Sequence, residues 1–320
     1  DRQPGVAGIG ECGPVPGLSS DDVPDFAERV ERACTLLTAE RLEAPEIGGA
    51  TARLAQEPEL APHRLPSLLF GLETALRDFA GGGRQRLWET PFSRGETGLP
   101  THGLIWMESA AGLLAQIERK VAAGHTVVKL KVGALPWAEE LALLQNVRRR
   151  WAAAALEVRL DANGAFGSVA EAEARLADLA PLGISYLEQP LAAGRCEETA
   201  YLCRCSPVPL VLDEELIGVA PAAAGVLLHQ LRPHGIILKP SLLGGFRAAE
   251  AWLAQAEALG IRWWTNSLLE SNIGLNAICQ WTARVDPAGA TVHGLGTGQL
   301  FVENLPPSME LAGATLWCRE

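Results

Sequence analysis

Short runs of apolar residues recur at regular intervals along the middle of the chain, and each run ends in a charged residue. The runs lie at residues 127–131, 156–161, 184–188, 208–213 and 235–239, and the charges that close them follow one another at intervals of 25 to 30 residues. An interval of this length holds one strand and one helix, and consecutive parallel strands of this kind build a β/α barrel. The pattern therefore predicts an α/β fold with a barrel at its centre.

The flanking segments extend this pattern. Gly103–Met107 is the predicted first strand, and a helix is expected after it from about residue 108 to 123. Arg262–Thr265 and Thr291–Leu295 are the predicted seventh and eighth strands, which would close the ring. We therefore assign residues 101–302 to a barrel domain.

Residues 1–100 lack the repeat and form a predicted second, smaller α+β domain. Gly8–Pro14 is a predicted strand that leads into a loop, and helices are predicted from Asp25 to Leu37 and from Ser67 to Leu76. Residues from about 303 to 320 are expected to return to this domain and complete it. The chain is thus predicted to be a barrel with a capping domain.

Five charged residues share one position in the repeat, at the carboxyl end of each predicted strand. They are Lys131, Asp161, Glu188, Asp213 and Lys239. The carboxyl ends of barrel strands form the active-site mouth, so these side chains are expected to meet there. A single aspartate at a strand end is commonly a turn former or a helix cap, but five charges at the same phase indicate a functional site.

Lys129 lies on the same strand face as Lys131, because alternate side chains of a strand point the same way. Two ammonium groups on one face of a buried strand are costly unless anionic groups face them. The three carboxylates are such groups. Their oxygens also suit a hard divalent cation, Mg²⁺ above all.

The chemistry that this residue set favours is removal of a proton next to a carboxylate. A bound cation would hold the substrate carboxylate and stabilise the enediolate, while a lysine would take the proton. Repulsion between Lys129 and Lys131 favours the neutral amine that a base needs. Asn163 and Glu214 neighbour two of the carboxylates and are expected to orient a ligand or a lysine.

Other residues near the predicted mouth carry weaker signals. Gly296 and Gly298 follow the eighth strand, where they either let backbone N–H groups approach a ligand carboxylate or simply form a tight turn. Trp106 either lines the pocket or fills the barrel. Of the six dispersed histidines, His102 is expected at the wrong end of the barrel for the site, and His293 is expected to be a packed core residue.

Composition narrows the class of protein. The chain of 320 residues is 48% hydrophobic with a formal net charge of −11, and no run of Lys and Arg offers a phosphate-binding face, which argues against a nucleic-acid partner. No apolar run reaches the roughly 18 residues of a membrane span. Seven scattered cysteines fit reduced thiols in a cytoplasmic protein. We expect a cytoplasmic enzyme that acts on a small-molecule carboxylate, and the oligomeric state stays open.

Several motifs resemble a known family in their order and spacing. The muconate-lactonising subgroup of the enolase superfamily is similar at Lys129-Leu130-Lys131, Asp161-Ala162-Asn163, Glu188-Gln189-Pro190, Asp213-Glu214 and Leu238-Lys239-Pro240. Within that subgroup, the o-succinylbenzoate synthases of menaquinone biosynthesis are most similar, through residues 101–107, 239–246, 270–277 and 294–301.

The resemblance implies an enolase-type modified β/α barrel with a smaller α+β cap, and Mg²⁺ as the cofactor, for which Mn²⁺ could substitute. Asp161, Glu188 and Asp213 would hold the metal, and Lys131 and Lys239 would be catalytic. The implied reaction is the dehydration of 2-succinyl-6-hydroxy-2,4-cyclohexadiene-1-carboxylate to 2-succinylbenzoate. The residues implied to bind substrate or to support the site are Lys129, Asn163, Glu214, Gly244, Gly245, Glu270, Ser271, Gly296 and Gly298.

Two further functions stay open, because relatives share the same core residues. One is an N-succinylamino-acid racemase or a dipeptide epimerase, and the other is an inactive barrel that acts as a binding protein. The family usually has two more strands before the region of Gly8–Glu11 and a mobile loop that closes over the substrate. The cap is therefore expected to be shortened at its N-terminal side, and whether a lid closes over the substrate stays open.

Overall fold

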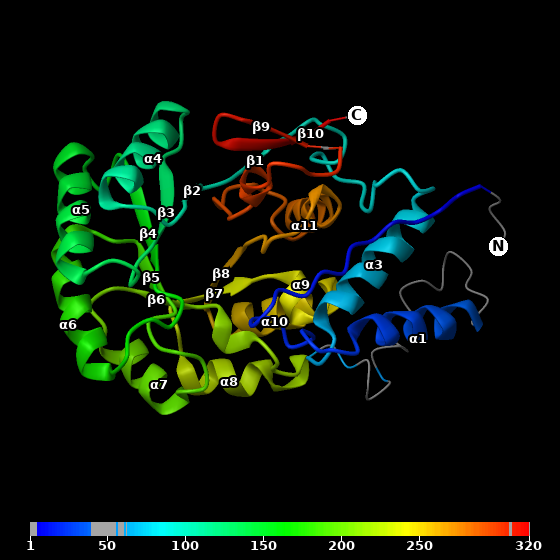
Figure 1. The fold of residues 1–320 in the computed structure, drawn as a ribbon, viewed down its shortest axis with the longest axis horizontal. Helices are drawn as coiled ribbons and strands as arrows, with labels where there is room; N and C mark the ends of the chain where they lie inside the picture. Colours follow the sequence, from blue (N-terminus) through cyan, green and yellow to red (C-terminus); the bar gives the residue numbers. More distant parts are fainter. Residues whose placement is uncertain (1–4, 40–55, 57–60, 62, 307–308, 320) are drawn as a thin grey trace.

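Seven parallel strands form one curled sheet in a computed structural model that describes residues 5–39, 56, 61, 63–306 and 309–319. The strands are hydrogen-bonded in sequence order (Figure 1). They are β2 (Gly103–Ile105), β3 (Val127–Lys131), β4 (Glu157–Asp161), β5 (Tyr186–Glu188), β6 (Leu210–Leu212), β7 (Gly235–Leu238) and β8 (Arg262–Thr265). This arrangement confirms the predicted α/β class and the enolase-type barrel with a smaller capping part.

A helix follows nearly every strand and covers the outside of the sheet (Figure 1). Serine side chains begin three of these helices, since Ser109, Ser168 and Ser271 each accept a hydrogen bond from a backbone N–H of the first turn. The helices are α4 (Ala110–Ala122), α5 (Trp137–Arg150), α6 (Val169–Leu179), α7 (Cys196–Cys205), α8 (Ala224–Leu231), α9 (Pro240–Leu243), α10 (Phe246–Ala258) and α11 (Asn272–Val285).

The predicted eighth strand is replaced by an irregular segment that still closes the ring. Residues 291–295 contain no regular strand, but His293 forms a parallel bridge with Thr101, and Gly294 forms one with Asn266. Backbone hydrogen bonds of 2.9 Å run from His102 N to His293 O and from Gly294 N to Thr265 O. The first and seventh strands are therefore joined through single bridges rather than through a ladder.

The capping part consists of two helices and a small sheet. The helices are α1 (Phe26–Ala39) and α3 (Pro66–Ala80), close to the ranges predicted for them. The antiparallel sheet has the order β1 (Leu99–Pro100), β10 (Thr315–Cys318), β9 (Met309–Ala312). The strand predicted at Gly8–Pro14 is wrong, because this segment runs without strand pairing. The domain boundaries at about 100 and 303 stay a prediction.

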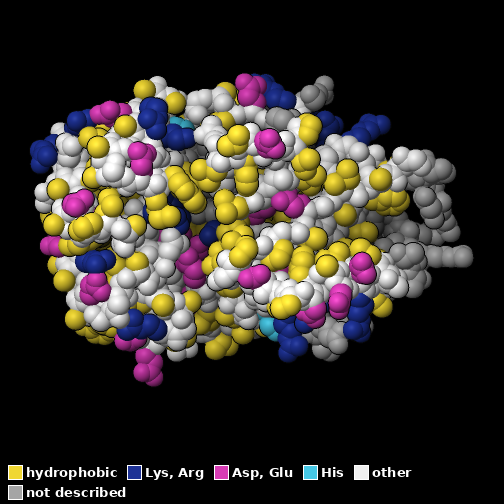
Figure 2. All heavy atoms as spheres, in the orientation of Figure 1, with side chains coloured by type: hydrophobic (Ala, Val, Ile, Leu, Met, Phe, Trp, Pro, Cys, Tyr) yellow, Lys and Arg dark blue, Asp and Glu magenta, His cyan; other side chains and the backbone are white. Residues whose placement is uncertain are grey.

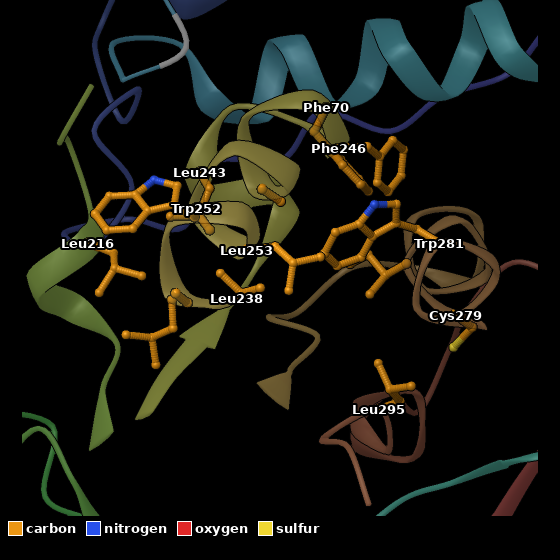
Figure 3. Packing of buried hydrophobic residues seen from close by; sticks show 14 of the residues in the cluster. Phe70, Leu216, Leu238, Leu243, Phe246, Trp252, Leu253, Cys279, Trp281 and Leu295 are labelled. Carbon is orange, nitrogen blue, oxygen red and sulfur yellow. The ribbon is translucent and has the colours of Figure 1, made fainter. Parts of the chain in front are cut away.

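An aromatic cluster joins the cap to the barrel. Phe70 of α3 lies 5.2 Å from Phe246 of α10, ring centre to ring centre, and Phe246 also packs against Trp88 and Trp281. Figure 3 shows Phe70, Phe246 and Trp281 pointing toward one another from three helices. The cap and the barrel therefore share one hydrophobic core.

Two carboxylates from the cap also bind the amino ends of barrel helices. Glu11 accepts hydrogen bonds from the backbone N–H groups of Ser271 and Gly274 at 2.7 and 2.9 Å, at the start of α11. Glu73 accepts one from Phe246 N at 2.6 Å, at the start of α10. Both helix ends leave donors unpaired and carry partial positive charge, which the carboxylates satisfy. These contacts fix the cap against the two helices that precede and follow β8.

Phe70→Ala is expected to lower the free energy of unfolding by about 3–5 kcal/mol, because it removes a fully buried ring and leaves a cavity. Phe70 is 1% exposed. Urea unfolding followed by tryptophan fluorescence measures the change. Val226→Ala, at a site that is 72% exposed, is the control and should be nearly neutral. An equal change in the two variants would contradict the shared core.

Glu73 is expected to make stability depend on pH. Burial raises its pKa to about 7, although the N–H groups of Arg247 and Phe246 oppose the rise. Because the pKa of Glu73 is higher in the folded state than in the unfolded state, protonated Glu73 stabilises the folded protein. This contribution to the free energy of unfolding is fully present below the pKa of the unfolded state, and it is lost as pH rises through 7. Relative to Glu73→Gln, the wild type should lose about 2 kcal/mol of unfolding free energy between pH 5.5 and 8. Parallel stability–pH curves for the two proteins would show that this carboxyl group does not titrate there.

In the part of the chain that is described, no helix has the length and apolar character needed to cross a membrane. The described structure shows free thiols at Cys12, Cys196, Cys203, Cys205, Cys279 and Cys318.

Candidate active site

Acidic and basic side chains meet at the carboxyl ends of the barrel strands. Lys131, Asp161 and Glu188 end β3, β4 and β5, and the sheet register places them directly opposite one another. Asp213 and Lys239 follow β6 and β7 without a gap. Figure 2 shows acidic and basic side chains together in a hollow near the middle of one face. The five residues meet at one end of the barrel because each of them stands at the same position in the sequence repeat.

Each of the three lysines at this site is paired with a carboxylate. Lys129 Nζ lies 2.7 Å from Glu188 Oε1 and 3.0 Å from Asp161 Oδ2. Lys131 Nζ donates to Asp161 Oδ2 at 2.7 Å and also to the Asn163 side chain. Lys239 donates to Asp213. The anionic partners that the two lysines of β3 required are therefore present.

The electrostatics of the group depend on these pairs. Burial opposes ionisation of Asp161, but the charges of Lys129 and Lys131 outweigh it and hold the pKa of Asp161 below its usual value. Burial and the neighbouring Asp161 charge raise the pKa of Glu188 well above normal. Burial works against a charged Lys239, yet the Asp213 and Glu188 charges keep its pKa raised.

Lys129 is likewise held as a cation. Burial opposes its charge, but Asp161 and Glu188 raise the pKa of its amine well above the usual value. Lys129 therefore acts as a fixed positive charge beneath the carboxylates, where it balances part of their repulsion. The neutral amine expected for the base at Lys131 stays a prediction.

The three carboxylates are engaged with lysines rather than arranged around a cation. Among the described residues, no group of three or more His, Cys, Asp or Glu side chains is placed to hold a metal ion. The chemistry of the set nevertheless fits one, because Asp161, Glu188 and Asp213 are buried oxygen donors from three consecutive strands. Glu188 Oε2 is buried and accepts no hydrogen bond within the described chain. A divalent cation would supply the partner that this oxygen lacks.

Asn163 and Glu214 lie at the rim of this group and are linked to it. Asn163 has a φ of +43°, and its Oδ1 accepts a hydrogen bond from the Lys131 amine. Its backbone N–H donates to Asp161 Oδ1 at 3.0 Å, and its Nδ2 donates to Glu214 Oε1 at 2.7 Å. This arrangement can orient both a lysine and a carboxylate. Their supporting role stays a prediction that these contacts favour.

Gln189 is a supporting residue that the sequence analysis did not single out. Its Oε1 accepts from the backbone N–H groups of Asp213 and Glu215 at 3.2 and 3.3 Å, and its Nε2 donates to Glu215 Oε2 at 3.2 Å. The side chain is 1% exposed and its backbone has a φ of +39°. It fixes the turn that presents Asp213. A glutamine directly after the strand-ending Glu188 was the available signal.

A cavity of about 190 Å³ opens above the charged group. Trp106 lines it and is 40% exposed, so this side chain belongs to the pocket rather than to the barrel interior. Val15 and Leu18 of the cap reach its other side. The cavity is lined by Val15, Leu18, His102, Leu104, Trp106, Lys129, Lys131, Asp161, Asn163, Glu214, Lys239, Asn266, Ser267, Leu268, Leu269, Gly294, Gly296 and Thr297.

Five of the predicted substrate-contact residues lie outside this lining. They are Gly244, Gly245, Glu270, Ser271 and Gly298. Gly244 and Gly245, with φ of +100° and +91°, connect α9 to α10. Glu270 accepts from the Ser241 hydroxyl and from Leu268 N at 2.8 Å, which braces the loop after β8.

The other two of these five, Ser271 and Gly298, also make contacts with the protein itself. Ser271 Oγ donates to Glu11 at 2.6 Å, while a Cβ on Gly298 would lie 3.0 Å from Leu275. The structure thus shows structural contacts for all five residues, and substrate contact by them stays a prediction. Gly296, by contrast, does line the cavity.

His102 was expected at the wrong end of the barrel, and that expectation is wrong. It lines the cavity together with Leu104 and Trp106, which lie on the same face of the first strand. The reason is the stagger of barrel strands, which places the amino end of the first strand level with the carboxyl end of the seventh. His293 is 0% exposed, stacks on Trp263 and accepts from Thr265 N, as expected of a packed core residue.

The fold and the site together define a class of protein. Residues 112–308 match the family model described as enolase C-terminal domain-like. An o-succinylbenzoate synthase of Desulfotalea psychrophila is 41% identical over 329 aligned positions, which cover 98% of this chain and 89% of that protein. The chain therefore belongs to the enolase superfamily and, within it, to the o-succinylbenzoate synthase family.

Two further comparisons, one with a solved structure and one with a racemase, add to this similarity. The crystal structure of MenC from Desulfotalea psychrophila LSv54 superimposes with a TM-score of 0.89 at 39% identity, and the match covers 98% of this chain and 91% of that one. An N-succinylamino acid racemase of Thermus thermophilus is 34% identical, but over 52% of this chain and 42% of that protein. The match to this synthase structure thus extends over 98% of the chain, and the match to the Thermus thermophilus racemase over 52%.

Proposed function

We propose that the protein dehydrates 2-succinyl-6-hydroxy-2,4-cyclohexadiene-1-carboxylate to 2-succinylbenzoate, a carbon–oxygen lyase reaction. The observation that carries the proposal is the placement of Lys131 and Lys239 on either side of three carboxylates that come from adjacent strands. Full-length similarity to an o-succinylbenzoate synthase supports the choice of substrate.

Lys131 acts as the base and then as the acid. Its amine, which lines the cavity, removes the proton from C1, next to the substrate carboxylate. The electron pair of the C1–H bond forms the C1–C6 double bond and completes the aromatic ring. The C6–O bond breaks, and Lys131 returns its proton to the departing oxygen, which leaves as water. One lysine on one face suffices for this syn elimination.

Asp161, Glu188 and Asp213 would hold a divalent cation, Mg²⁺ or Mn²⁺, after their lysine partners shift. When bound, the cation would neutralise the negative charge that develops on the substrate carboxylate as the proton leaves. Lys239, which pairs with Asp213 in the structure, adds a positive charge on the opposite side. Asn163 keeps the Lys131 amine aligned.

An assay of the purified protein on the cyclohexadiene substrate, with and without Mg²⁺, tests the proposal. We expect turnover that requires the metal and stops on chelation. A metal-loaded protein that leaves this substrate unchanged but interconverts the enantiomers of an N-succinylamino acid would overturn the dehydration and favour racemisation.

Racemisation is the second candidate because the two lysines could serve both faces of one carbon. Racemases need a base on each face, and Lys131 and Lys239 would provide them. Partial similarity to the Thermus thermophilus N-succinylamino acid racemase agrees with this possibility. A dipeptide epimerase would use the same pair of lysines. We expect racemisation or epimerisation as at most a side activity.

The cytoplasmic location stays a prediction from the cysteine content.

A further inference from the structure

Two buried polar side chains on the wall of the cavity lack hydrogen-bond partners. His102 is 4% exposed and Asn266 is 5% exposed, and both line the cavity. Within the described chain, His102 Nδ1 and Asn266 Oδ1 have no partner. A buried polar atom without a partner costs roughly 1–3 kcal/mol, so such atoms on residues that line a ligand cavity favour a partner group supplied by the ligand.

Gly294 brings these two side chains together. Its bridge with Asn266, and the bridge of its neighbour His293 with Thr101, place Gly294 between Asn266 and His102 in the ring. A Cβ on Gly294 would lie 2.2 Å from Asn266 Oδ1 and 2.7 Å from His102 Cε1. Glycine at this position thus leaves room for both side chains to lie over its backbone, next to each other.

The chemistry of the pair selects one kind of ligand group. Burial, together with the Arg159 and Lys129 charges, lowers the pKa of His102 well below its usual value, so the ring is neutral and has one donor and one acceptor nitrogen. The amide oxygen of Asn266 only accepts. A hydroxyl group can accept from the imidazole and donate to the amide at once. A carboxylate can accept from the imidazole but cannot donate to the Asn266 oxygen, because it has no hydrogen to give.

We infer that His102 and Asn266 bind the C6 hydroxyl of the substrate and hold its oxygen while it leaves. This inference rests on the proposed dehydration. His102 precedes β2, the strand next to β3 with Lys131, so the proton donor and the hydroxyl-binding pair line the same cavity. The C6–O bond breaks, its electron pair stays on the oxygen, and the Lys131 proton completes a water molecule.

The pair also makes the site selective. An N-succinylamino acid with an alkyl side chain has no hydroxyl to give and leaves both atoms unpartnered, which disfavours its binding relative to the dehydration substrate. The product 2-succinylbenzoate lacks the hydroxyl too, so product affinity should not depend on the pair. These two ligands therefore separate recognition of the hydroxyl from general support of the pocket.

The test compares His102→Leu and Asn266→Leu with the wild type in three measurements. We expect kcat/KM for dehydration to fall about 10- to 100-fold in each variant. The Kd of 2-succinylbenzoate, measured by calorimetry with Mg²⁺ present, should stay within about twofold of the wild type. His102→Asn, which keeps a polar atom near the position of Nδ1, should recover part of the loss. Thr265→Val, which removes a buried unpartnered hydroxyl outside the cavity lining, is the matched control and should change neither quantity.

Unchanged dehydration in both leucine variants would overturn the inference, and so would a loss of product affinity that parallels the loss of kcat/KM. A wild-type protein that does not dehydrate the substrate would overturn the proposed function instead. If the leucine variants lose their circular-dichroism spectrum, His102→Ala and Asn266→Ala provide the same three readouts with a smaller change in packing.

Discussion

Replacing Asp213 by Asn is expected to abolish turnover and to remove the stabilisation by Mg²⁺, while the metal-free protein keeps its fold. Asp213 is 3% exposed and would be one of three metal ligands, so an amide in its place leaves the cation with one charge fewer. At a metal concentration of 100 times the Kd, binding stabilises the wild type by about 2.7 kcal/mol, and the variant should lose most of this.

Charge balance explains why the metal-free variant should stay folded. The four acidic side chains Asp161, Glu188, Asp213 and Glu214 lie together with three lysines. Removing the Asp213 charge relieves its repulsion with Glu188 and Glu214, which offsets the lost ion pair with Lys239. We expect the thermal midpoint without metal to change by no more than a few degrees.

Thermal unfolding with and without Mg²⁺, together with the dehydration assay, measures both effects. Glu257→Gln removes an exposed carboxylate of α10, outside the cavity lining, and serves as the control, with full metal stabilisation and activity. If Asp213→Asn behaves like this control, Asp213 is not a metal ligand.

The sequence predicts the barrel and its mouth because both follow from local periodicity. Each apolar run forms a strand, and each charge at its end reaches the same side of the sheet, as the register of Lys131, Asp161 and Glu188 shows. The irregular closure at residues 291–295 could not be predicted, because single bridges replace the ladder that an apolar run normally forms. Local pattern thus determines the elements, while closure of the ring depends on partners that are far away in sequence.

Contacts between distant segments account for what the sequence analysis missed. Glu11 binds the start of α11 across 260 residues, and nothing in the Gly8–Pro14 pattern indicates this partner. His102 enters the cavity only because barrel strands are staggered, which is a property of the closed ring. Glycines 244 and 245 connect two helices, and their contact with the substrate stays a prediction. Motif similarity indicates that a residue matters and does not distinguish a substrate contact from a structural one.

The distinct roles of the two lysines should appear when each is replaced by Arg. Lys131→Arg is expected to lose dehydration by about 10²- to 10⁴-fold, because Arg keeps a cation but does not act as a base at ordinary pH. Lys239→Arg should retain measurable dehydration, reduced by the misfit of the larger group. Lys239 pairs with Asp213 in the structure, and a guanidinium can form the same pair.

The reason for this asymmetry is that the two reactions need different numbers of bases. Syn elimination uses one acid–base group on one face of C1, whereas racemisation needs a group on each face. Lys131 ends β3 and Lys239 follows β7, two strands that are four positions apart in the ring, so the lysines lie on either side of the carboxylates. Any racemase side activity should therefore disappear in both variants, while dehydration disappears only in Lys131→Arg.

Exchange of the C1 proton with deuterated solvent provides a second readout, independent of water loss. Lys131→Arg should stop exchange as well as elimination, and Lys239→Arg should leave exchange with the substrate detectable. Far-UV circular dichroism and Mg²⁺-induced thermal stabilisation establish that both variants keep the fold and the metal site. Equal and complete loss of dehydration in the two folded variants would contradict a purely electrostatic role for Lys239, and would require that both lysines move protons in the reaction.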